Sequence, residues 1–468
     1  MDGIGCSTGG PLLWCFPYAQ FFRIYPASAP SCQPFARTPC TSAVGSPIPN
    51  GFIFSDPDRR FLTQMSSYPG FSFDITHRDP AGSKARIGTL STPHGAIQTP
   101  NFIFCGTKAA IKGLTTQQMR EEKTDIILAN TYHLMIQPGA DLVAKLGGLH
   151  KMMDWQGPML TDSGGYQIFA MGHGSVADEV KGRRTTTREK TLLKITEEGA
   201  TFRSYTSGEK LFLTPEKSID IQRKLGPDFV VQLDECTPFH VDRRYTARSM
   251  QMSHRWGDRS LAAFRNFGGI SANGLPQAMY GIVQGGVYPD LRKESAEYTA
   301  SRDFFATAVG GCLGATREQM HEVVGMAMSH VHSDRPVHLL GIGGIVDIFE
   351  GVAWGIDTFD CVSPTRIARH GWALAPGVKG ERLNMRNARF KDDDRPIDAE
   401  CGCHACRTAS RGYIHHLLKA EEMLGMQLLT MHNVHTMNRL MRDVRAAIIN
   451  GTLDETRRKW VWQPGGEE

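Results

Sequence analysis

The chain has no apolar run close to the roughly 20 residues that a helix needs to cross a bilayer. The apolar stretch Leu12–Phe22 is short and contains Pro17, so we do not expect an integral membrane protein. Excess charge is also lacking, because the 468 residues carry a net charge of only +4. A nucleic-acid partner would therefore have to be bound by local basic patches, since the charge of the whole chain provides little attraction.

Acidic residues are almost missing from the first part of the chain, where Asp2 is the only one before Asp56. Residues 1–70 are instead rich in Ser, Pro and Gly, with Arg23 and Arg37 among them. This composition predicts an amino-terminal extension that is either disordered or an organelle-targeting segment. Apart from import through this segment, we expect a cytoplasmic protein.

The cysteine spacing of a disulfide framework is missing as well. Of the eleven cysteines, four precede residue 70, three lie between Cys401 and Cys406, and the others occur singly in or beside predicted strands. Thiols clustered at metal-ligand spacing indicate a reducing compartment in which a metal holds them.

The sharpest local motif is this cysteine cluster, which is followed by His432. The candidate ligands are Cys401, Cys403, Cys406 and His432. Three thiolates and one imidazole predict a closed tetrahedral Zn²⁺ site with a structural role, because no position is left open for water. Apolar residues at helical spacing between the clusters predict a helix that returns the chain to the thiols. A final helix is expected from Asn433 to about Asn450, capped by Gly451.

Eight short apolar or β-branched runs recur along the chain, separated by segments with helical periodicity. Continuous apolar runs are typical of parallel strands buried on both faces. They predict an α/β fold, namely a (β/α)₈ TIM barrel with a C-terminal structural zinc-binding subdomain. The runs are Phe102–Gly106, Asp125–Asn130, Met159–Asp162, Phe229–Asp234, Met279–Gln284, Phe305–Gly311, His338–Gly343 and Gly355–Asp360.

Two further segments complete the expected organisation. Ala85–Ser91 and His94–Thr99 predict a hairpin that closes the barrel floor. A basic insertion over residues 172–198 predicts a surface loop or short helix, which either contacts an RNA backbone or is a solvated charged segment. The expected parts are the extension (1–70), the catalytic barrel (71–395) and a zinc-binding helical subdomain (396–468).

Most of the eight runs end at a residue able to do chemistry or to bring backbone close to a ligand. In a TIM barrel the C-terminal strand ends build one active site, so these residues are expected to be neighbours although they are far apart in sequence. They are Asp162, Asp234, Gln284, Gly311 and Asp360.

Two of these carboxylates suit glycosyl transfer. One can attack an anomeric carbon to give a covalent intermediate, while the other donates and later removes a proton. Asp360 and Asp162 are the candidates for these two roles. Asp234, with Gln284 and the Gly311 backbone, then complements the edge of guanine. Taken singly, each strand-end Asp could equally be a helix cap.

Four motifs and the Cys/His set together resemble the tRNA-guanine transglycosylases from about residue 71 to the end. The motifs are Asp162–Gln167 (DSGGYQ), Asp234–Pro238 (DECTP), Gly281–Gly285 (GIVQG) and Phe359–Arg366 (FDCVSPTR). Members of that family are zinc-containing (β/α)₈ barrels that replace guanine at the wobble position of tRNAs with a 7-deazaguanine. The resemblance implies partner tRNAs with a GUN anticodon, which are those for Asp, Asn, His and Tyr.

The resemblance also implies a role for each site residue. Asp360 would be the nucleophile on the ribose C1′ and Asp162 the general acid and base. Asp234, Gln284 and Gly311 would bind the base, with Tyr166 and Leu340 on its two faces. Arg366 and Arg369 would contact the anticodon loop, whose bases can be splayed out and recognised on their edges. As alternatives, Tyr166 and Leu340 could belong to the core, and the two arginines could be solvated.

The chain departs from the bacterial pattern at informative positions. Cys312–Gly314 stands where bacterial members usually read Leu-Ala-Val, which leaves space beside the 7-substituent. The glycine resembles the eukaryotic enzymes, which accept queuine, and Cys312 is a further base-binding candidate. Cys236 follows the bacterial form, whose substrate is preQ1. The incoming base is therefore queuine or preQ1. Gly343–Gly344 and His370 also differ from the usual family residues.

Three functions from different classes are compared. The transglycosylase is favoured over a non-catalytic tRNA-binding partner subunit, because both catalytic candidates are present. A barrel glycoside hydrolase has no reason to carry a set of residues that complement guanine. The expected assembly is a homodimer or a heterodimer with a non-catalytic homologue.

Overall fold

The computed structural model describes residues 68–172, 192–238 and 241–464. The described residues all fall within one compact unit, Gln64–Glu468. Almost all of the predicted extension, together with most of the predicted basic insertion, lies outside the described residues. The described chain begins at Tyr68, whose ring packs against Phe264 and Phe305.

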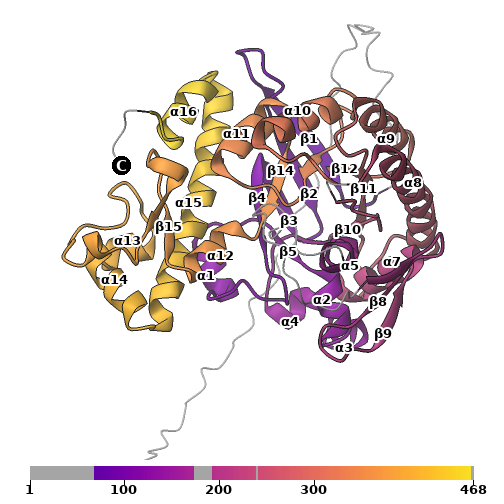
Figure 1. Cartoon of the computed structure of the whole chain (residues 1–468), viewed down its shortest axis with the longest axis horizontal. Coiled ribbons are helices and arrows are strands. Elements are labelled where there is room, and N and C mark those ends of the chain that lie inside the picture. The colour runs from indigo at the N-terminus through magenta and orange to yellow at the C-terminus, as the bar shows by residue number, and fades with distance from the viewer. Residues whose placement is uncertain (1–67, 173–191, 239–240, 465–468) are drawn as a thin grey trace, which may run out of the picture. The chain divides into compact units, whose positions relative to one another are not determined.

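Eight parallel strands form a closed barrel, and each lies within or overlaps one of the eight predicted runs (Figure 1). All residues of these strands are buried except Cys361, as expected for strands covered on both faces. The predicted (β/α)₈ barrel is therefore confirmed. In barrel order the strands are β4 (Asn101–Cys105), β5 (Ile127–Ala129), β6 (Met159–Thr161), β10 (Phe229–Val231), β11 (Ala278–Val283), β12 (Ala306–Val309), β13 (Val337–Leu339) and β14 (Thr358–Cys361).

Helices connect these strands, and several begin and end at recognisable capping residues. Helix α7, for example, starts after Thr214, whose side chain accepts a hydrogen bond from the Lys217 N–H, and ends at Gly226 with a φ of 75°. Such caps satisfy backbone groups that a helix leaves unpaired. The helices are α1 (Thr116–Glu121), α2 (Thr131–Ile136), α3 (Ala140–Lys145), α4 (Gly148–Met153), α5 (Gly165–Gly172), α7 (Pro215–Leu225), α8 (Arg243–Asn266), α9 (Pro289–Ser301), α10 (Arg317–Met328), α11 (Ile345–Ala353) and α12 (Ser363–Arg369).

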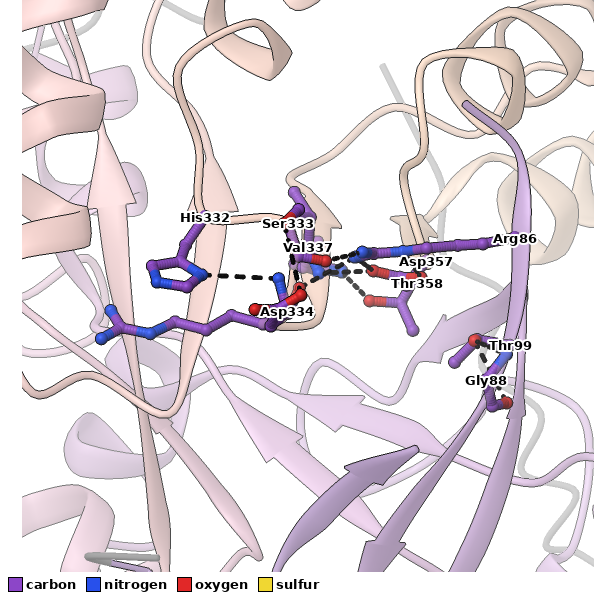
Figure 2. A network of polar contacts seen from close by, with 11 residues as sticks. Arg86, Gly88, Thr99, His332, Ser333, Asp334, Val337, Asp357 and Thr358 are labelled. Carbon is purple, nitrogen blue, oxygen red and sulfur yellow. Dashed lines mark hydrogen bonds and ion pairs between the residues drawn. The ribbon is translucent and has the colours of Figure 1, made fainter. Parts of the chain in front are cut away.

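A three-stranded antiparallel sheet lies at the N-terminal ends of the barrel strands. It consists of β1 (Ser72–Arg78), β2 (Arg86–Thr92) and β3 (Gly95–Thr99), so the predicted hairpin is confirmed. Figure 2 shows Arg86 reaching from β2 to Asp357, the residue before β14. The Arg86 Nε and Asp357 Oδ1 are 2.9 Å apart, and the guanidinium also donates to the Ser333 and Arg335 carbonyls.

The end of the basic insertion is a strand, not a loop or short helix, so that part of the prediction is wrong. Strand β7 (Leu192–Ile195) pairs with β8 (Ala200–Arg203), which pairs with β9 (Lys210–Leu213). The sheet is stabilised through β8, where Ala200 and Phe202 are buried. This pairing depends on residues beyond the insertion, which its charge pattern does not reveal.

The carboxy-terminal part consists of two short strands and four α-helices, with 3₁₀ turns at Lys379–Glu381 and Ala388–Phe390. The last long helix begins at Met423 rather than at the predicted Asn433, so His432 lies inside it. Its predicted cap is confirmed, because Gly451 ends it with a φ of 66°. The elements are β15 (Trp372–Leu374), β16 (Arg382–Asn384), α13 (His404–Thr408), α14 (Arg411–Lys419), α15 (Met423–Asn450) and α16 (Leu453–Trp460).

Within the described ranges, none of the helices is both long enough and apolar enough to traverse a lipid bilayer.

Candidate active site and metal centre

The predicted site residues lie at or just beyond the C-terminal ends of the barrel strands. Asp162 follows β6, Asp234 follows β10, Gln284 follows β11, Gly311 follows β12, Leu340 follows β13 and Asp360 lies within β14. The three carboxylates lie near one another. The negative charge of Asp360 raises the pKa of Asp162, and the negative charge of Asp162 raises the pKa of Asp234. The barrel thus brings together residues that are far apart in sequence.

Three donors hold the Asp162 carboxylate. Asn130 Nδ2 and Gln167 Nε2 donate to Oδ2 at 2.7 and 2.6 Å, and the Thr131 N–H donates to Oδ1 at 2.7 Å. Burial raises the pKa of Asp162, these hydrogen bonds oppose the rise, and the charge of Asp360 adds to it. The carboxylate therefore caps the start of α2, the helix after a neighbouring strand, and is also oriented at the barrel mouth.

Asp360 is held differently, although it is also buried. The Gly341 N–H and His338 Nε2 lie 2.7 and 3.2 Å from its Oδ1, while the Cys105 thiol lies 3.5 Å from Oδ2. His338 is itself fixed, since its Nδ1 lies 2.9 Å from Thr358 Oγ1. Burial raises the pKa of Cys105, so this neighbour remains a neutral thiol, which is a weak donor.

The third carboxylate forms a polar cluster with the predicted base-binding residues. Gln284 Nε2 donates to Asp234 Oδ2, and Ser163 Oγ lies 3.5 Å from Oδ1. Burial raises the pKa of Asp234 to about 7. Gly311 has a φ of 75°, and a side chain there would collide with Gln284 Oε1. Glycine is therefore required for the backbone to approach this cluster closely.

The remaining base-binding candidates surround the same cluster. Tyr166 is 49% exposed at the start of α5, so it is not a core residue. Burial and the nearby Cys236 raise its pKa, and Asp360 adds to this effect. Cys312 is half-buried. Leu340 is also half-buried, and its Cδ1 would lie 2.9 Å from a side-chain carbon placed on Gly310.

Positive charge gathers beside the mouth. Arg366 and Arg369 lie on α12. Both are close enough to Lys112, in the loop after β4, for their positive charges to affect its pKa. Burial lowers the pKa of Lys112, and the charges of Arg369, Lys108 and Arg366 lower it further. Lys108 and Lys112 were missed by sequence reasoning, because about 250 residues separate them from the two arginines.

Other functional neighbours were also missed, but some had a signal. Asn130 ends a predicted strand and Gln167 lies in the DSGGYQ motif, so both could have been placed at the mouth. His338 lies within β13, and nothing in its run marks the side chain as facing Asp360. Arg292, on α9, donates to the Gly310 and Cys312 carbonyls, but no local motif connects it to the site.

The predicted metal ligands do come together. His432 Nδ1 lies 3.6 Å from Cys401 Sγ, 3.6 Å from Cys403 Sγ and 3.3 Å from Cys406 Sγ. A tetrahedral ion at usual thiolate and imidazole distances holds such ligands about 3.6 Å apart. His432 Nε2 is 2.8 Å from the Leu374 carbonyl, which orients Nδ1 toward the thiols. This cluster can hold a metal ion.

A second group with metal-ligand chemistry lies at the floor, where His94 and His150 face Asp228. The two rings are stacked, with centroids 3.7 Å apart and planes within 10°. Ring lone pairs lie in the ring plane, so parallel rings do not converge on one ion. Burial raises the pKa of Asp228, but the two histidines lower it by more. The group is therefore better described as a buried carboxylate beside two imidazoles than as a metal site.

Comparison with known proteins gives a consistent result. The family described as Queuine tRNA-ribosyltransferase matches residues 79–464. A protein of that name from Roseiflexus sp. (strain RS-1) is 47% identical over 399 residues, which are 83% of this chain and 99% of that protein. Those from Symbiobacterium thermophilum and Protochlamydia amoebophila are 44% and 43% identical, covering 85% and 81% of this chain and 92% and 95% of their own lengths.

Proposed function

The chain belongs to the Queuine tRNA-ribosyltransferase family, and from that premise we propose a tRNA-guanine transglycosylase, which is a pentosyltransferase. It exchanges guanine at the wobble position of tRNAs with a GUN anticodon for queuine or preQ1. The observation that carries this proposal is the convergence of Asp162, Asp234 and Asp360 at one end of the barrel.

The chemistry is a retaining double displacement. An Asp360 carboxylate oxygen attacks the ribose C1′, the bond to guanine breaks, and Asp162 donates a proton to the departing base. Asp162 then removes a proton from the incoming base, whose ring nitrogen attacks C1′ and releases Asp360. The raised pKa of Asp162 suits a group that must both give and take a proton.

Base recognition involves the cluster around Asp234. Its carboxylate accepts from a ring N–H and an exocyclic amine, while Gln284 and the Gly311 N–H face a carbonyl oxygen. Tyr166 and Leu340 cover the two faces of the base. Cys312 lies beside the 7-substituent, and the space that the Cys312–Gly314 segment leaves there accommodates either queuine or preQ1.

The remaining parts serve the tRNA and the fold. Arg366 and Arg369, with Lys108 and Lys112, contact the phosphates of the anticodon loop. The Cys₃His cluster holds a structural Zn²⁺, since four protein ligands leave no open position. The working assembly is a homodimer or a heterodimer with a non-catalytic homologue, located in the cytoplasm. The division at residue 395 between barrel and zinc subdomain is kept as part of this proposal.

One experiment tests class and substrate together. The purified chain is incubated with tRNA of the GUN class and with labelled guanine, preQ1 and queuine in parallel, and base incorporation into tRNA is measured. We expect exchange of guanine and of at least one 7-deazaguanine. If no base is incorporated by the chain alone or with a homologous subunit added, the transglycosylase proposal fails. Activity that needs the homologous subunit and survives Asp360→Asn in this chain would favour the non-catalytic partner.

A further inference from the structure

A buried arginine joins the two loops that carry the base-binding candidates. Arg292, in the first turns of α9, is completely buried. Its Nε donates to the Gly286 carbonyl at 2.7 Å and its Nη1 to the Val283 carbonyl at 3.1 Å. Nη1 and Nη2 also donate to the Gly310 and Cys312 carbonyls, both at 2.8 Å. One side chain therefore holds both the loop after β11 and the loop after β12.

Arg292 is unusual for a buried charge. Burial lowers its pKa to about 10, so it is still protonated at neutral pH. Buried charges are normally paired with an opposite charge. Among the described residues, however, the recorded hydrogen-bond acceptors of this guanidinium are four neutral backbone carbonyls. The guanidinium supplies donors to these four carbonyls, and because it is charged it also polarises the peptides that carry them.

The orientation of one of these peptides matters for the pocket. In a trans peptide the C=O and the following N–H point in opposite directions. The Gly310 carbonyl points at Arg292, so the Gly311 N–H points away from Arg292. A side chain on Gly311 would collide with Gln284 Oε1, so Gly311 borders the base-binding cluster. The Gly311 N–H is thus directed away from Arg292 at a residue that lines this cluster.

We propose that Arg292 is a positioning residue for base recognition, which orients and polarises the Gly310–Gly311 peptide toward a carbonyl oxygen of a purine-type base. This inference rests on the proposed function. A cation on the oxygen side of a peptide strengthens the N–H as a donor, because hydrogen bonds in a chain polarise one another in a low dielectric. Arg292 therefore acts on affinity for the 6-oxo group without touching the base.

The chain offers a matched control at the opposite end of the barrel. Arg86 is also buried, being 5% exposed, and also donates to two backbone carbonyls. It is paired with Asp357, the residue just before β14 (Figure 2), and therefore lies at the end of the barrel away from the base-binding cluster. Variants of Arg86 therefore report the general cost of losing a buried guanidinium.

The test compares Arg292→Lys and Arg292→Met with Arg86→Lys and Arg86→Met. Guanine exchange into tRNA gives kcat, the KM for guanine and the KM for tRNA, and 6-thioguanine serves as a competing base. Thioguanine keeps the ring N–H and the exocyclic amine but replaces the carbonyl oxygen with sulfur, a weaker acceptor. The preference for guanine over 6-thioguanine therefore reports the hydrogen bond at issue.

We expect the Arg292 variants to raise the KM for guanine about tenfold, the scale of a lost or weakened hydrogen bond. Their preference for guanine over 6-thioguanine should fall, with Lys retaining more of it than Met, while the KM for tRNA changes little. The Arg86 variants should melt at lower temperature and keep both the KM and the preference.

Three results would overturn the inference. An unchanged preference in both Arg292 variants would show that the peptide does not depend on Arg292. Equal changes of the KM for guanine and of the base preference in the Arg86 variants would show that the effect comes from a general loss of stability. Failure of both Arg292 variants to fold would make the residue structural. A wild-type chain without any base exchange is a different result, because that outcome rejects the proposed function itself.

Discussion

The two carboxylates assigned to the chemistry differ in which oxygen is left available. Both oxygens of Asp162 accept strong donors from Asn130, Thr131 and Gln167. In Asp360 the strong donors converge on Oδ1, while Oδ2 has the Cys105 thiol as its neighbour. A carboxylate oxygen with a weak donor keeps more of its nucleophilicity, so the geometry favours Asp360 Oδ2 as the attacking atom.

Replacement of this nucleophile gives the first prediction. Asp360→Asn should lower base exchange by several orders of magnitude and abolish the covalent tRNA complex, because an amide does not form the acylal-type bond to C1′. Melting temperature and metal content should stay close to those of the wild type. The complex is measured by denaturing electrophoresis with labelled tRNA, and an adduct that survives in the variant would contradict the assignment.

The pKa of Asp234 gives a pH-dependent prediction. In the proposed site Asp234 accepts two hydrogen bonds from the base, which requires the ionised carboxylate, and burial raises the pKa of Asp234 to about 7. The ionised fraction therefore rises about tenfold between pH 6 and pH 8, and the KM for guanine should fall by a similar factor. The KM for tRNA, measured over the same range, is the control.

Stability should respond to Asp234 in the opposite direction. Because the folded pKa lies above the ordinary 3.8, the folded state binds the extra proton and loses stability as pH rises from about 4 to 7. Asp234→Asn should therefore melt at higher temperature at pH 8, bind the base weakly and show a flat pH profile. If the KM for guanine in this variant still depends on pH as it does in the wild type, the titrating group is not Asp234.

Residues at the ends of predicted strands could be found from the sequence, and residues that act through others could not. Asp162, Asp234 and Asp360 each follow or end an apolar run, so the barrel alone places them together. Arg292 and His338 act across the fold, on the Gly310 carbonyl and on Asp360. Their partners are 18 and 22 residues away in sequence, at no fixed spacing that a motif would show.

At the scale of elements, helix α12 joins the active site to the metal centre. It follows the strand of Asp360 and carries Arg366 and Arg369. Asn433, next to the metal ligand His432, donates to the Pro364 and Trp372 carbonyls at 2.9 and 3.1 Å. The metal cluster therefore supports the helix that presents positive charge at the mouth.

Loss of a metal ligand should consequently affect tRNA more than the base. Cys403→Ala removes a ligand from the proposed Zn²⁺ site. A structural Zn²⁺ contributes on the order of 10 kcal/mol to folding, so the carboxy-terminal part should unfold at lower temperature. Where activity remains, the KM for tRNA should rise while the KM for guanine changes little. Metal content and both KM values are measured.

The exposed neighbour His404 provides the control for this element. His404→Ala lies within the same motif but outside the ligand set, so it should retain metal, stability and both KM values. If Cys403→Ala keeps the wild-type melting temperature, or chelation leaves that temperature unchanged in the wild type, the structural role of the metal is wrong.

Element boundaries were less predictable than the elements themselves. All eight barrel strands follow from continuous apolar runs, because burial on both faces leaves that signature. The start of α15 could not be predicted in this way, because Met423 and Leu424 in its first turn are exposed and no side chain caps the helix. Strand β7 is half exposed and its pairing partner lies outside the predicted insertion, so its local pattern was weak.

At the scale of the whole compact unit, chemistry and stability are placed at opposite ends of the barrel. The strand C-terminal ends carry the carboxylates, and the floor carries the buried Arg86–Asp357 pair and the His94–Asp228–His150 group. Polar groups at the floor have no role in the proposed reaction. They instead fix the β1–β3 sheet against the barrel.

The floor therefore predicts a variant with low stability and normal kinetics. Arg86→Met leaves the buried Asp357 carboxylate unpaired, which typically costs about 3–5 kcal/mol. The free energy of unfolding in denaturant should fall by that amount, with kcat and both KM values unchanged for the folded fraction. A change in the KM for guanine at low temperature would show that the two ends of the barrel are not independent.

Helix α15 has fixed contacts along its length. His432 belongs to the metal cluster, Asn438 donates to the Glu122 carbonyl at 2.7 Å, and Arg445 donates to the Pro100 carbonyl at 2.7 Å, just before β4. One residue added or removed between these positions would rotate the far part by about 100° and detach it from its partners. Substitutions on the exposed side of this helix leave these three contacts intact, whereas an insertion or deletion between residues 432 and 445 would break at least one of them.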